Sequence, residues 1–183
     1  ADNPHSSIPQ LFNARGKSVK YITKAADEIR SQLNGNNITY VVNRNINYTN
    51  ICVYSCSFCA FSKSTGAKKL RGASYLLELE EIQNRVREAI RRGATEVCLQ
   101  GGIHPKFDGN YYLDVIKAIR KVSPDIHIHA FSPLEIFQGA HTLGLTLEEY
   151  LPILKEAGLN SLPGTAAEIL HDDVRDIICP DKL

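Results

Sequence analysis

Residues 79–102 decide the fold class, and they read LEEIQNRVREAIRRGATEVCLQGG. From residue 79 onward the apolar residues recur at helical spacing, and this pattern ends at Gly93. It predicts a helix over 79–92. Residues 96–100 then form a short apolar run that two glycines close, which predicts a strand. A helix followed directly by a strand is the repeating unit of a parallel α/β sheet.

The same alternation continues toward the C-terminus. Further helices and strands are predicted at 111–122, 126–130, after the capping residue Thr146, at 159–162 and at 172–178. The predicted class is therefore α/β, a (β/α) barrel of parallel strands. Because a closed barrel takes about 250 residues and this chain has 183, we expect only the N-terminal half of the barrel. We expect such a half barrel, on its own, to self-associate and to turn over little substrate.

The chain before the predicted barrel carries a helix of its own. Residues 18–33 have helical apolar spacing, and residues 38–42 are rich in β-branched and aromatic residues, which predicts a strand. A second extended stretch leads from there toward the cysteines. We therefore expect an N-terminal helical extension over 1–37 and a core domain over 38–183 that is incomplete at its C-terminus.

Charge and hydropathy exclude several function classes. Lys and Arg number 21 against 20 Asp and Glu, so the net charge is +1 and no global field would recruit nucleic acid or an acidic membrane. No apolar run approaches the roughly 20 residues of a membrane span, and the first residues lack the layout of a signal peptide. We expect small-molecule partners and a cytoplasmic location, with an organellar location left open.

Three of the five cysteines form a compact motif. Cys52, Cys56 and Cys59 give the pattern C-x-x-x-C-x-x-C, and thiolates at such spacing can converge on one soft metal centre. Cubane clusters usually have four cysteine ligands. Three thiolates would leave one iron open, and that iron can chelate the amino and carboxylate groups of S-adenosylmethionine (SAM).

Two other interpretations of the cysteines stay open. A zinc site would need a fourth Cys or His, and the nearest ones, Cys98 and His104, fall on a different predicted element. Inert buried thiols are common, although three within eight residues beside polar Asn and Ser make a poor core pattern. The spacing favours a metal cluster over both.

The ends of the predicted strands supply candidate cofactor ligands. Gln100, Gly101 and Gly102 follow a strand, where paired glycines let the backbone approach a ligand; we assign them to the methionine end of SAM. An ordinary βα turn is the alternative. Glu168 follows the fourth predicted strand and could bind the ribose hydroxyls or amino group of SAM, or could simply compensate a helix dipole.

Aromatic and titratable residues complete the candidate set. Phe58, between two cysteines, could pack on the adenine of SAM or belong to the core. His127 and His129 share one face of a predicted strand. We take His129 and Glu168 as catalytic candidates, with a satisfied structural histidine as the alternative for His129. Glu135 lies near the same predicted strand end, and the same two interpretations, a functional or a structural role, apply to it.

Longer segments resemble a known enzyme family. The matching stretches are residues 45–50, 100–105, 129–135, 162–170 and 179–182. The first two, with the cysteine triplet, resemble the radical SAM branch that contains the deazaflavin synthase subunits and the futalosine-pathway enzymes of menaquinone synthesis. The others look like the CofH subunits of FO synthase and the C-terminal half of FbiC-type fusions. The resemblance runs from about residue 17 onward.

The resemblance implies a cofactor set and a reaction. It implies that Cys52, Cys56 and Cys59 hold a [4Fe-4S] cluster, which splits SAM into methionine and a 5′-deoxyadenosyl radical. In this family the radical takes a hydrogen from L-tyrosine, the Cα–Cβ bond breaks, and the 4-hydroxybenzyl group joins 5-amino-6-(D-ribitylamino)uracil on the way to the deazaflavin FO. A CofG-type partner subunit or fused domain is implied as well.

Two alternative functions remain at this level. A futalosine-pathway enzyme would share the Asn-Tyr-Thr-Asn start and the cysteines, and the segments that discriminate are Pro-Gly-Thr-Ala-Ala-Glu at 163–168 and Gln-Gly-Ala at 138–140. These segments favour the deazaflavin interpretation. The other alternative is an inactive truncated product or a protein that binds metal only structurally.

Overall fold

The computed structural model describes residues 7–54, 56–60, 72–164 and 169–182. Contacts divide the chain into two compact units, residues 1–40 and 41–183. In the part of the chain that is described, no helix is both long enough and apolar enough to cross a membrane.

The first unit is helical. It contains α1 (Ile8–Phe12), which the sequence did not predict, and α2 (Lys17–Asn34), which confirms the helix predicted over 18–33. The strand predicted over 38–42 is wrong, because these residues lie in no strand and the Ile38 side chain is 92% exposed. Their β-branched composition favours extended backbone, but strand pairing begins only at Asn43.

The second unit is built on a three-stranded parallel sheet. Its strands are β1 (Asn43–Asn47), β2 (Glu96–Gln100) and β3 (His127–Ala130), in the order β1-β2-β3. Both neighbouring pairs are parallel. This topology confirms the α/β class and gives a partial barrel.

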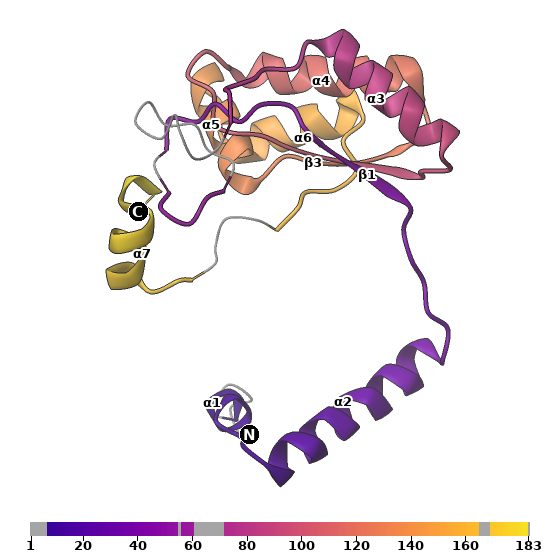
Figure 1. The fold of residues 1–183 in the computed structure, drawn as a ribbon, viewed down its shortest axis with the longest axis vertical. Coiled ribbons are helices and arrows are strands. Elements are labelled where there is room, and N and C mark those ends of the chain that lie inside the picture. The colour runs from indigo at the N-terminus through magenta and orange to yellow at the C-terminus, as the bar shows by residue number, and fades with distance from the viewer. Residues whose placement is uncertain (1–6, 55, 61–71, 165–168, 183) are drawn as a thin grey trace. The chain divides into compact units, whose positions relative to one another are not determined.

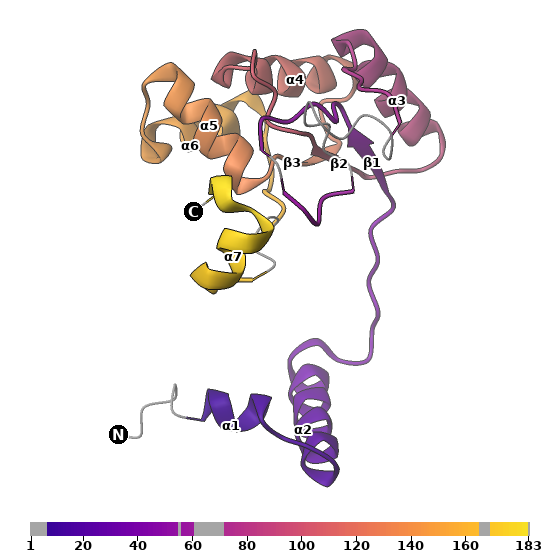
Figure 2. The ribbon, with the colours of Figure 1, turned by 60° about the vertical axis from the view of Figure 1, so that its left-hand side comes forward.

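Helices cover one face of this sheet. They are α3 (Leu79–Arg91), α4 (Gly109–Val122), α5 (Pro133–Leu143) and α6 (Leu147–Ala157), and Figure 1 shows them on the same side of the strands. The alternate residues that face the helices, such as Ile46, Leu99 and Ile128, are fully buried. The chain continues through α7 (Asp172–Ile178) to the short 3-10 helix η2 (Pro180–Lys182), and Figure 2 gives a second view.

Capping residues fix where α5 and α6 begin. The predicted capping box of Thr146 and Glu149 is present at α6, and Gly158 ends that helix in the left-handed region. The same device starts α5, where Ser132 and Glu135 cap each other beside Pro133. We did not predict α5, although its capping signature is in the sequence.

The fourth strand, predicted over 159–162, is wrong. Only one parallel bridge forms, between His129 and Ser161. The Asn160 side chain interrupts the ladder because its Oδ1 accepts the N–H of Ile128 at 2.8 Å, in place of a backbone carbonyl. The described residues therefore hold three strands, and a single parallel bridge stands where the fourth strand was expected.

Candidate active site

A cavity lies at the carboxyl ends of the three strands. Its volume is about 450 Å³. The segments that follow β1, β2 and β3 line it, together with the C-terminal segment; among the lining residues are Thr49, Cys52, Cys56, Phe58, Cys59, Gln100, Gly101, Gly102, Glu135 and Lys182. This is the edge at which parallel α/β folds place their ligands.

Two buried polar residues anchor the chain just before the cysteines. Thr49 Oγ1 donates to the Tyr75 carbonyl at 2.7 Å. The Asn50 amide makes two bonds, one to the Ala73 carbonyl at 3.0 Å and one from the Tyr75 N–H at 2.9 Å. Because Thr49 and Asn50 are 2% and 6% exposed, these hydrogen bonds are buried, and they hold the loop in place.

The cysteine loop is also tied to the glycine turn after β2. The Gly102 N–H donates to the Thr49 carbonyl at 3.0 Å, and the Val53 N–H donates to the Ile103 carbonyl at 2.9 Å. The Ile103 N–H donates to Cys52 Sγ at 3.3 Å. The two loops therefore form one rigid wall, and one cysteine sulfur already has a backbone donor.

Only glycine fits at the turn itself. A Cβ at Gly102 would lie 2.3 Å from the Ile51 carbonyl oxygen and 2.9 Å from the Cβ of Cys52. A Cβ at Gly101 would lie 2.4 Å from the ring of Tyr48. The sequence suggested that these glycines let a ligand approach; the structure shows in addition that they let the cysteine loop approach.

Gly102→Ala is expected to displace the cysteine loop, because the Ile51 backbone cannot move away without breaking the wall. We expect a loss of about 2 kcal/mol in the free energy of unfolding, the usual scale of overpacking, and a lower iron content after cluster reconstitution. Denaturant unfolding and iron analysis measure these. Gly164→Ala is the control, since no atom of the described residues lies within 4 Å of its added Cβ. Equal effects of the two substitutions would contradict the close-approach argument.

Glu135 is a fully buried carboxylate under the glycine turn. Its Oε1 accepts from the Tyr48 hydroxyl and from the Gly101 N–H at 3.1 Å. Its Oε2 accepts from the N–H and hydroxyl of Ser132 at 2.7 and 2.6 Å. Burial raises the pKa of Glu135 above its usual value, while these hydrogen bonds act in the opposite direction. One side chain thus joins the ends of all three strands.

The C-terminal segment packs against the cysteine loop. The Ser57 N–H donates to the Ile178 carbonyl at 2.8 Å. Burial raises the pKa of the Cys56 thiol, and a hydrogen bond with the Lys182 side chain opposes this rise. The sequence did not predict that Lys182 would reach the cavity.

The donor set fits a cluster. Within the described ranges, no three His, Cys, Asp or Glu residues are placed to hold a single metal ion. The ligands of a cubane bind different irons, so they need to surround a shared cavity, as Cys52, Cys56 and Cys59 do. The hydrogen bond from the Ile103 N–H to Cys52 Sγ suits a thiolate. These cysteines would hold a [4Fe-4S] cluster.

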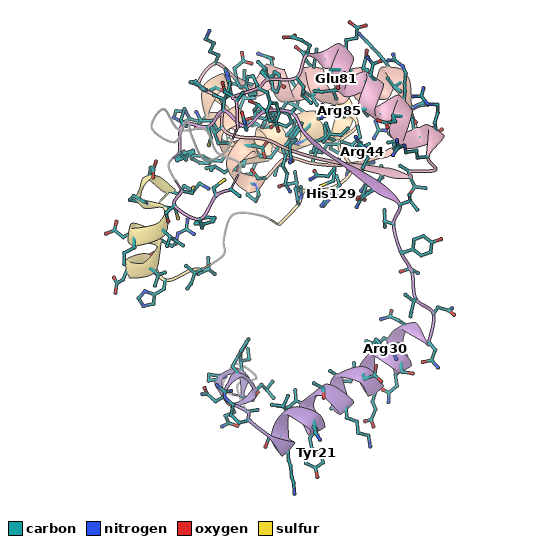
Figure 3. All side chains as sticks on the ribbon, in the orientation of Figure 1. Tyr21, Arg30, Arg44, Glu81, Arg85 and His129 are labelled. Carbon is teal, nitrogen blue, oxygen red and sulfur yellow. The ribbon has the colours of Figure 1, made fainter. Side chains whose placement is uncertain are left out.

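The other predicted residues fall into three groups. Phe58, 44% exposed, and the Gln100-Gly101-Gly102 turn line the same cavity as the cysteines. His129 does not line it; its Nδ1 lies 2.7 Å from Ser161 Oγ on the sheet face turned away from α3 and α4, as Figure 3 shows. Glu168 lies outside the described residues.

Comparison with known proteins assigns the family. The sequence model of the Radical SAM superfamily matches residues 46–182, which include the cysteines, the glycine turn and the C-terminal segment. The chain belongs to the radical SAM superfamily. Members of this superfamily use a [4Fe-4S] cluster and SAM.

Individual proteins match this radical SAM chain over most of its length. It is 50% identical over 173 residues to the 5-amino-6-(D-ribitylamino)uracil–L-tyrosine 4-hydroxyphenyl transferase of Methanothermobacter thermautotrophicus, covering 94% of this chain and 46% of that protein. It is 45% identical to the FO synthase of Streptomyces avermitilis, covering 94% of this chain and 20% of that protein. The chain thus spans about half the length of the curated transferases that it matches.

A solved structure supports the fold alone. The radical SAM chain superposes on HydG, a maturase of the [FeFe]-hydrogenase, with a TM-score of 0.66 and 20% identity. The match covers 93% of this chain and 35% of HydG.

Proposed function

We propose that this chain belongs to a transferase that joins the 4-hydroxybenzyl group of L-tyrosine to 5-amino-6-(D-ribitylamino)uracil in deazaflavin biosynthesis. The observation that carries the proposal is the 50% identity across 94% of the chain to a protein of that name. The cavity supports it, because the three cysteines and the glycine turn of a radical SAM site line one space. When bound, the cluster and SAM supply a 5′-deoxyadenosyl radical that removes a hydrogen atom from a substrate.

The chain's own residues place the cofactors. Cys52, Cys56 and Cys59 bind the cluster, and the turn at 100–102 runs along the methionine end of SAM. Phe58 packs on the adenine. Its 44% exposure and its place in the cavity lining support this role.

Glu168 is assigned to the ribose hydroxyls or amino group of SAM. Glu168→Gln is therefore expected to weaken SAM binding by about 1–3 kcal/mol, the scale of losing a charge-assisted hydrogen bond. Calorimetric titration of the cluster-loaded protein with SAM measures this. The control is Glu156→Gln, at an exposed position on α6. An unchanged affinity for SAM in Glu168→Gln would contradict the assignment and favour the alternative, in which Glu168 compensates a helix dipole.

The sheet face turned away from α3 and α4 is suited to polar substrates. The interior of a (β/α) barrel is usually filled with branched apolar side chains. Here the pairing register places Asn45, Cys98 and His129 in one row across the strands, and Ser161 Oγ lies 2.7 Å from both His129 Nδ1 and His127 Nε2. Such a row offers donors and acceptors to a uracil with its ribityl chain. We assign proton transfer to His129, which the Ser161 hydroxyl orients.

A partner and a location complete the proposal. The chain covers only 20% of the Streptomyces FO synthase, and a CofG-type subunit or fused domain supplies the remaining chemistry of FO formation. The near-neutral charge of the chain and its small-molecule substrates are consistent with a cytoplasmic location.

Transfer of a labelled ring tests the function. The cluster-loaded protein is incubated anaerobically with SAM, ring-labelled tyrosine and the aminouracil, and products are separated by mass spectrometry. We expect the label to appear in a 4-hydroxybenzyl adduct of the uracil, with 5′-deoxyadenosine as coproduct, and no adduct when the uracil is omitted. Formation of 5′-deoxyadenosine without transfer of the label would contradict the assignment of the substrates.

A further inference from the structure

We propose that Lys182 sets the reduction potential of the cluster by placing its ammonium group in the wall of the cavity that the three cysteines line. The inference rests on the proposal that the three cysteines bind the cluster. It concerns residues 172–182, which we call the C-terminal strap. Neither the cysteine motif nor the glycine turn requires a cation at this place.

The strap is docked on the loop that carries the cysteines. The Ser57 N–H donates to the Ile178 carbonyl at 2.8 Å, and Ser57 Oγ donates to the same oxygen at 3.1 Å. Ser57 directly follows Cys56 in the sequence. The strap therefore meets the cysteine loop next to the ligand on which Lys182 acts.

The backbone of Lys182 is fixed from two sides. Its N–H donates to the Cys179 carbonyl at 3.0 Å, and its carbonyl accepts from Arg175 Nη2 at 2.9 Å. Arg175 Nη1 also donates to the Ile169 carbonyl at 3.2 Å. Arg175 thus ties the end of the strap to the residue Ile169, which precedes the strap, and sets where the lysine side chain starts.

The side chain of Lys182 extends toward the cluster cavity. Its Nζ lies 5.8 Å from the ring centroid of Tyr54, and the residue lines the cavity with all three cysteines. Cation–π attraction from the Tyr54 ring favours this position of the ammonium group. Lys182 thereby brings a charged group to the cavity of the cysteines, whereas the Ile103 N–H is a neutral donor to Cys52 Sγ.

Hydrogen bonds to the sulfurs and the local net charge set the potential of an iron–sulfur cluster. Reduction adds one electron to the cluster, and a low-potential one-electron donor loses that electron. No bond forms or breaks in this step. Because the added negative charge is attracted by the ammonium group, Lys182 favours the reduced state and raises the potential.

Potentiometric titration of the cluster-loaded full chain, followed by electron paramagnetic resonance of the reduced cluster, tests this. For Lys182→Gln we expect the ratio of reduced to oxidised cluster at a fixed applied potential to fall about tenfold. This corresponds to a reduction potential that is lower by about 59 mV for a one-electron couple. Lys182→Arg should stay close to the unsubstituted protein because it keeps the charge. Lys117→Gln, an exposed position on α4, should have no effect.

A second substitution tests the strap without touching the ammonium group. Arg175→Ala removes the bonds that fix Lys182, and we expect a smaller shift of the potential in the same direction. A shift in Lys182→Gln with unchanged iron and sulfide content supports the proposal.

Two results would overturn the proposal, and they are distinguishable. An unchanged reduction potential in Lys182→Gln at full cluster content overturns this proposal and leaves the cluster assignment intact. If the affinity for SAM falls in that variant while the potential is unchanged, Lys182 binds a carboxylate. Failure of the unsubstituted chain to bind iron and sulfide in reconstitution would overturn the cluster assignment itself, together with this inference.

Discussion

Cys56→Ala is expected to abolish cluster binding and with it the cleavage of SAM. Three thiolates are the fewest that hold a cubane while leaving one iron open, so the loss of any one leaves an incomplete ligand set. Cys52→Ala and Cys59→Ala should behave in the same way. Iron and sulfide per chain, and 5′-deoxyadenosine formed after reduction in the presence of SAM, measure the effect.

The two remaining cysteines are the matched controls. Cys98 lies in the middle of β2, and Cys179 follows α7. Neither lines the cavity. Cys98→Ala and Cys179→Ala should therefore keep most of the cluster and most of the SAM cleavage. Full activity in Cys56→Ala would show that the cysteine assignment is wrong.

Glu135→Ala is expected to lower the free energy of unfolding by about 4 kcal/mol. The substitution removes the acceptor of the Tyr48 hydroxyl, the Gly101 N–H and the Ser132 N–H, and an unsatisfied buried donor costs about 1–3 kcal/mol. The losses are not fully additive, because relaxation and water entry recover part of them. Urea unfolding monitored by circular dichroism measures the change.

The second capping box supplies a matched control. Glu149 holds the same position in α6 as Glu135 holds in α5, but Glu149 is exposed, and among the described residues its side chain bonds to Thr146 alone. Glu149→Ala should cost about 1 kcal/mol, the usual value for a helix cap. If both substitutions cost the same, Glu135 is only a helix cap and does not join the strand ends.

Local signals predicted much of the fold. The helical spacing over 79–92 and the apolar run over 96–100 gave α3 and β2 nearly at their observed bounds. The strand predicted over 38–42 failed because β-branched composition reports only a local preference, whereas a strand needs a partner. The strand over 159–162 failed because the side chain of Asn160 replaces a backbone acceptor, which periodicity does not reveal.

The candidate site was predictable where its residues are close in sequence. The cysteine triplet and the glycine turn carry local signatures, and the structure brings both to one cavity. The links between Tyr48 and Glu135, 87 residues apart, and between Cys56 and Lys182 have no local signature, because folding alone brings these side chains together. The capping signature formed by Ser132, Pro133 and Glu135 is in the sequence, and it could have predicted that Glu135 begins α5.

A Mössbauer spectrum of the reconstituted protein, recorded before and after addition of SAM, tests the central claim most directly. If Cys52, Cys56 and Cys59 hold a [4Fe-4S] cluster, the spectrum should show a cubane in which one iron differs from the others. The signal of that iron alone should change when the amino and carboxylate groups of SAM bind to it. A colourless protein that binds zinc, or a cluster whose irons all stay unchanged on addition of SAM, would contradict the account.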